Sequence, residues 1–235
     1  MLKIFAFLII ATASVTVAVF GAFRATYPYV LASEEARKSL EVTVEQMNEL
    51  RSAELCSDMI AFGIFSALLC GVLAACCSTS NKLSDQLVGC IAGLALGALA
   101  GAGTGWIGHW LELNPSFDIR DPIVYSALRW SIMLVPVAIA AGIAASVSTR
   151  SFSKIASSVT GAVLGSIAAA MFYALVSGSL TTMETRSKIL PFHDTNRILI
   201  VAASVFCIGG GIILQLHRNT EKGVSIPPHD AKSTA

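Results

Sequence analysis

The sequence predicts an all-α integral membrane protein: a polytopic bundle of about six transmembrane helices, with one extramembrane helix after the first span. Hydrophobic residues make up 54% of the chain and charged residues 13%, roughly half the charged fraction usual in globular proteins. The charges lie between apolar runs of about 20 residues, the length of helix that crosses a bilayer core about 30 Å thick. Helix is expected because lipid offers backbone N–H and C=O groups no partner.

Six apolar runs define the organisation of the chain. The predicted spans are residues 4–23, 58–77, 87–108, 125–147, 155–177 and 198–216. The chain therefore divides into a first transmembrane helix (1–23), an outer extramembrane helix (24–57), a five-helix glycine-rich bundle (58–216) and a cytoplasmic tail (217–235). The tail contains Pro227, Pro228 and small polar residues, a composition typical of disorder.

The first run has two interpretations. Lys3 followed by an apolar stretch, with Ala32 before Ser33, also resembles a secretory signal with its cleavage site. The stretch is longer than the apolar core of about 7–15 residues usual in signal peptides. We therefore favour an uncleaved first span, and cleavage would leave five spans in the same orientation.

Basic residues in short connections bear on which side of the membrane is cytoplasmic. Their count does not decide it here, because the other side also holds basic residues: Arg24, Arg37, Lys38, Arg120, Arg186 and Lys188. The connections near Lys82 and Arg150 and the tail with Arg218 share one side of the predicted bundle. Interfacial aromatic residues gather on the other side; they are Tyr27, Tyr29, Trp106, Trp110, Tyr125 and Trp130. We expect both termini in the cytoplasm, and the predicted location is a bacterial inner (cytoplasmic) membrane.

Residues 33–55 read as a helix outside the membrane, with Ser33 able to cap its start. One face carries a short apolar stripe, and another carries the acids Glu41, Glu45 and Glu49. In one interpretation this helix continues into the second span and leans on neighbouring loops. In the other, the acidic face binds a partner or a second copy of the chain.

A glycine zipper is the most specific pattern in the sequence. Gly89, Gly93, Gly97, Gly101 and Gly105 recur every fourth residue in the third span. The fifth span has a weaker version in Gly161, Gly165 and Ala169. Small residues on one helical face allow close approach of another helix, and the partner is a helix of the same chain or of a second copy; a pore lining is a further alternative. We expect the third and fifth spans to be central.

The sequence also contains a faint internal repeat. Gly-Ala-rich segments near residues 71–93 have counterparts near residues 142–165, about 70 residues later. An even number of spans separates the copies, so they would be parallel repeats, as in some transporters.

Candidate chemistry is sparse. His109 and Glu112 are three residues apart on one helical face, and His193 and Asp194 lie in the next outer loop, so these four side chains are the candidate ligands for a divalent metal. No mechanistic signature accompanies them. The six cysteines lack disulfide or CxxC spacing and read as small packing residues. We expect no enzyme and no cofactor.

The middle of every predicted span lacks an ionisable residue, which argues against ion-coupled transport. The net charge of +1 gives no basis for binding nucleic acid. The function that the sequence favours is association in the bilayer, as a homo-oligomer or with a partner membrane protein. A passive channel or small-solute permease, with a helix broken at Pro136 or residues 209–211, is the alternative, and a metal enzyme is a weaker one.

Overall fold

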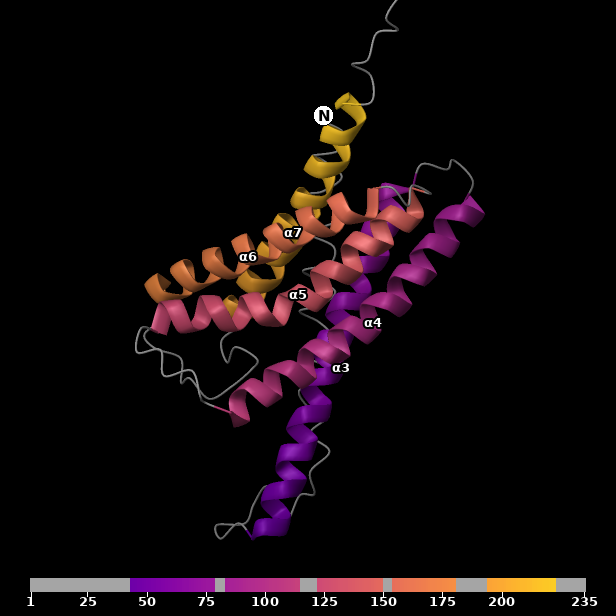
Figure 1. The fold of residues 1–235 in the computed structure, drawn as a ribbon. Helices are drawn as coiled ribbons and strands as arrows, with labels where there is room; N and C mark the ends of the chain where they lie inside the picture. Colours follow the sequence, from indigo (N-terminus) through magenta and orange to yellow (C-terminus); the bar gives the residue numbers. More distant parts are fainter. Residues whose placement is uncertain (1–42, 79–82, 115–121, 150–153, 181–193, 223–235) are drawn as a thin grey trace, which may run out of the picture.

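The computed structural model describes residues 43–78, 83–114, 122–149, 154–180 and 194–222, and its elements are helices (Figure 1). They are α3 (Val44–Cys77), α4 (Leu83–Leu113), α5 (Pro122–Ser148), α6 (Ile155–Leu180) and α7 (Asp194–Lys222). Within the described residues, five helices are long and apolar enough to cross a membrane. The all-helical class, with helices long and apolar enough to span a membrane, is therefore confirmed for this part of the chain. The first predicted span, residues 4–23, lies outside it.

Each of the five later predicted spans falls inside one helix, and one helix end differs from expectation. Residues 44–57, the described part of the outer segment, form a single unbroken helix, α3, with the second span, as one of the two interpretations expected, and we call them the stem. α7 continues to Lys222, so residues 217–222 are helical although we expected a disordered tail from 217. Residues 217–222 include the helix-forming residues Arg218, Glu221 and Lys222.

The start of α3 is fixed by a capping box at Thr43. The Thr43 hydroxyl accepts a hydrogen bond from the backbone N–H of Gln46 at 3.3 Å, and the Gln46 side chain accepts one from the Thr43 backbone N–H at 3.0 Å. Two backbone donors at the helix start are satisfied in this way. Thr43 therefore caps this helix, and Ser33, the cap expected from the sequence, lies outside the described residues.

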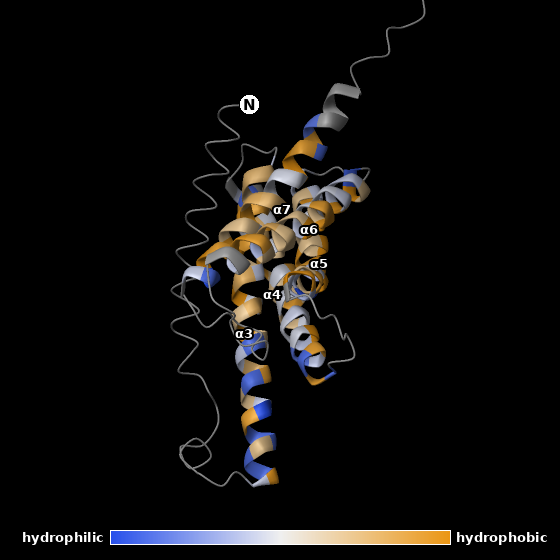
Figure 2. Ribbon diagram, turned by 90° about the vertical axis from the view of Figure 1, so that its left-hand side faces the viewer, coloured by the Kyte–Doolittle hydropathy of each residue, from blue (hydrophilic) through white to orange (hydrophobic). Residues whose placement is uncertain are grey.

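The helices alternate in direction, so the bundle has two ends. At one end α3 enters from the stem, α4 and α6 finish, and α5 and α7 begin; we call it the stem end. Figure 2 shows the stem as a largely hydrophilic stretch of α3 that projects from the apolar bundle.

The central helix is α5, and the expected central position of the third span is wrong. α5 packs against α3, α4 and α6 and touches α7, whereas α4 packs mainly on α3. Leu99 of α4 is 75% exposed, while Met133, Leu134 and Val137 of α5 are fully buried. The reason is that the glycine stripe of α4 allows close packing on one face of that helix. α5, by contrast, carries apolar side chains on several sides and can pack against several helices. The six cysteines are all free.

Candidate functional site

The glycine stripe of α4 lies against the backbone of α3. At each of its last four glycines, an added Cβ would come closer than 3.0 Å to backbone atoms of α3. The pairs are Gly93 with Cys70, Gly97 with Ser66, Gly101 with Phe62, and Gly105 with Met59. Because no side chain fits between the two backbones, the contact depends on glycine at every one of these positions.

The first glycine of the stripe has a different neighbour. A Cβ at Gly89 would lie 2.8 Å from the Oγ atom of Ser148 in α5. The stripe as a whole therefore faces helices of the same chain, and α3 covers its last four positions, Gly93 to Gly105.

The small residues of α6 make a second close contact, with α7. Added Cβ atoms at Gly161 and Gly165 would collide with the backbone carbonyls of Gly211 and Cys207, respectively. Ala169, the next position of that stripe, is fully buried. The stripe of α4 therefore faces the preceding helix, α3, whereas the stripe of α6 faces the following helix, α7.

A charged residue that our reading of the sequence overlooked lies where the stem enters the bundle. Asp58 of α3 is only 8% exposed. Electrostatic interactions link its carboxylate to Glu112 of α4, to Glu54 one turn earlier in α3, and to Arg129 of α5. Two acids and one base, Arg129, therefore act on this buried carboxyl group. In the sequence, Asp58 could have been noticed because it is the first residue of an apolar run.

Three side-chain contacts connect α5 to its neighbours. The Trp130 ring lies 6.2 Å from the Phe62 ring of α3 and 5.3 Å from the Tyr173 ring of α6, measured between centroids. The Thr104 hydroxyl of α4 donates a hydrogen bond of 2.9 Å to the backbone carbonyl of Met133. Aromatic edge contacts of this kind contribute about 0.5–1.5 kcal/mol beyond the area that they bury.

The structure describes part of the candidate metal site. His109 and Glu112 lie one turn apart near the end of α4, and Asp194 begins α7. His193 falls outside the described residues. Among those described, no three His, Cys, Asp or Glu side chains are close enough together to hold a metal ion.

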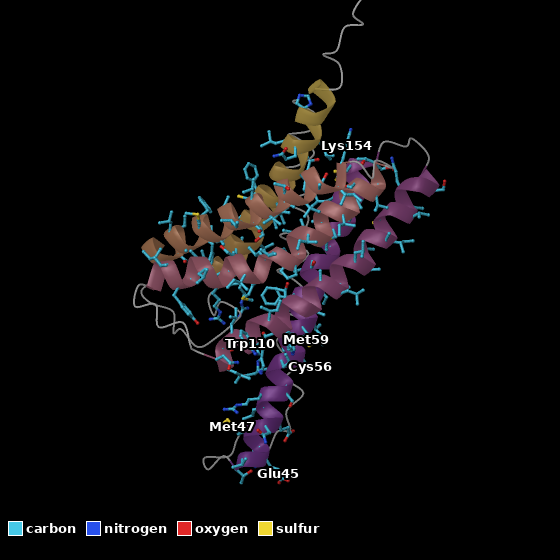
Figure 3. All side chains as sticks on the ribbon, in the orientation of Figure 1. Glu45, Met47, Cys56, Met59, Trp110 and Lys154 are labelled. Carbon is cyan, nitrogen blue, oxygen red and sulfur yellow. The ribbon has the colours of Figure 1, made fainter. Side chains whose placement is uncertain are left out.

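The stem presents acidic and apolar side chains to its surroundings. Figure 3 places Glu45 and Met47 at the free end of the stem, and Cys56, Met59 and Trp110 where α3 enters the bundle. Glu45 and Glu49 are exposed, and Met47 is 42% exposed. Glu41, the third acid of the expected face, lies outside the described residues.

No protein-family model matches this chain, and comparison with curated proteins and with solved structures gives no match. The arrangement of the helices is therefore the basis for inferring function.

Proposed function

We propose that the protein is a non-enzymatic membrane protein that associates with another membrane protein through the stem of α3. The observation that carries this proposal is the continuity of α3 from the bundle into an exposed acidic helix. Three acids, Glu45, Glu49 and Glu54, are exposed on the stem, against one exposed base, Arg51. The excess of negative charge suits a partner with a basic surface.

The anchoring of α3 supports this role. Inside the bundle, the backbone of α3 is held against α4 by the glycines from Gly93 to Gly105. A stem that is continuous with a fixed helix is held in place before binding, which reduces the ordering that association requires. The exposed apolar side chains of Val44 and Met47 add surface that a partner can bury.

The stripe itself is not the proposed contact surface. The last four glycines of the stripe, Gly93 to Gly105, already face α3, so a second chain that reached them would have to displace that helix. Association through the stem leaves the bundle intact, and the large exposed side chains on α4 and α6, such as Leu99 and Leu164, remain in contact with lipid.

The proposed orientation places the stem outside the cytoplasm and both termini inside it, in a bacterial inner membrane. Trp106 and Trp110 near the stem end of α4 are 54% and 49% exposed, as expected of residues at a membrane interface. Lys154 precedes α6 at the opposite end of the bundle, in agreement with a cytoplasmic side rich in basic residues.

The proposal is tested by the protein mass of the full-length chain extracted from its native membrane in a mild detergent. Light scattering that separates protein from detergent should give a complex heavier than one 24.6 kDa chain. The double substitution Glu45→Lys with Glu49→Lys should return the mass to that of a single chain. The control Asn48→Ala, exposed on the same stem, should not. A wild-type chain that is monomeric under these conditions contradicts the proposal.

A further inference from the structure

We infer that the bundle moves as two rigid units, α3–α4 and α5–α6–α7, that shift against each other along a seam lined by side chains. This motion is separate from the proposed association, because it depends on contacts inside the bundle and not on the stem.

Inside each unit the helices touch through their backbones. Gly97 and Gly101 of α4 meet carbonyl oxygens of α3, and Gly165 of α6 meets a carbonyl of α7. α5 joins the second unit at Gly142, where an added Cβ would lie 2.7 Å from the Cα atom of Val159 in α6. Sliding such an interface by one residue would drive a side chain into the opposite backbone, so these contacts hold their register.

Across the seam, three contacts involve side chains. Phe62 meets the Trp130 ring, the Thr104 hydroxyl reaches the Met133 carbonyl, and Gly89 faces the hydroxyl oxygen of Ser148. Rotation of these side chains lets the interface repack without breaking a helix. Small sliding motions of packed helices of this kind are a common route to conformational change.

The limited contact between the outer helices leaves room for this motion. Apart from the contacts of α5, the described parts of the two units touch only slightly, chiefly between α3 and α7. The charged side chains also divide across the seam at the stem end: Asp58 and Glu112 belong to one unit and Arg129 to the other. A shift at this end therefore changes how far the charges are separated.

The test is a set of distance distributions between pairs of spin labels, carried on non-cysteine labelling residues in the full-length protein in lipid nanodiscs. All label sites are exposed positions. Ile60 with Leu99 reports on the first unit, and Leu164 with Leu214 on the second. Leu113 with Leu175 reports across the seam at the stem end.

The two pairs inside the units should each give one narrow distance, and the pair across the seam should give two resolved distances. A distribution across the seam as narrow as those inside the units would overturn the inference, and so would equally broad distributions inside the units.

A matched pair of threonine variants locates the seam. Thr104→Val removes the hydroxyl bond across it and should change the ratio of the two populations about fivefold, the effect expected for one hydrogen bond. Thr160→Val removes a bond to Ala156 within α6 and should leave the ratio unchanged. An unchanged ratio in Thr104→Val, or an equal change in both variants, would contradict the assignment.

Discussion

Gly101 of α4 lies directly against the backbone carbonyl of Phe62 in α3, while the Phe62 side chain packs on the Trp130 ring of α5. The backbone of Phe62 thus contacts α4, and its side chain contacts α5. The contact combines the two kinds of packing in this bundle, close backbone contact at glycine and side-chain contact elsewhere.

Gly101→Leu should destabilise the folded protein by about 3 kcal/mol, because the new side chain has no space against the α3 backbone. The control is Gly103→Leu on the same helix, since a Cβ at Gly103 meets nothing within 4 Å. It should change stability by less than about 0.5 kcal/mol. Equilibrium unfolding in bilayers measures both, and equal effects of the two variants would argue against the α3–α4 interface.

Gly165→Leu should weaken the contact between α6 and α7 in the same way and by a similar amount, since a side chain there collides with the carbonyl of Cys207. Gly210→Leu on α7 is its control, because an added Cβ there has open space around it. Thermal aggregation in detergent compares them. A tolerated leucine at 165 would show that the two helices do not pack at this point.

Trp130→Ala should destabilise the protein by about 3–5 kcal/mol, the usual loss for removing a large buried ring. The side chain is buried and contacts rings from α3 and α6. Trp106→Ala removes an equally large ring that is half exposed on α4, and its loss of stability should be below about 1 kcal/mol. Denaturation followed by circular dichroism distinguishes the two, and comparable losses would contradict the position of Trp130 in the core.

Asp58→Asn and Arg129→Gln should be energetically coupled. The two charges interact across the boundary between α3 and α5, and charged residues in one network give coupling energies of about 0.5–3 kcal/mol in double-mutant cycles. The cycle needs the unfolding free energies of both single variants and of the double variant. Strict additivity would mean that Arg129 does not compensate the buried Asp58.

The spans were predictable because their signal is local. An apolar run of about 20 residues specifies a membrane helix wherever it occurs, and the five later runs all lie within helices of the structure. The glycine repeat likewise indicated a helix with one close neighbour. Its period could not say which neighbour, because every helix backbone offers the same surface to a glycine.

The central position of α5 and the role of Asp58 depend on tertiary contacts. A stripe of small residues suggested that the third span is central, yet α4 packs mainly on one helix and exposes Leu99. Asp58 looked like an ordinary residue at a membrane boundary, because the sequence does not show that Glu112 and Arg129 come close to it in the folded chain.

The claim that the stem binds a partner is tested most directly by photo-crosslinking in the native membrane, with a photoreactive residue in place of Ser52 on the exposed stem. The same residue in place of Leu99 on the exposed face of α4 serves as the control. We predict one discrete protein adduct from position 52, lost in the Glu45→Lys, Glu49→Lys background, and only lipid adducts from position 99. If position 52 yields no protein adduct, or yields one that survives the charge reversal, the stem is not the acidic docking element proposed for it.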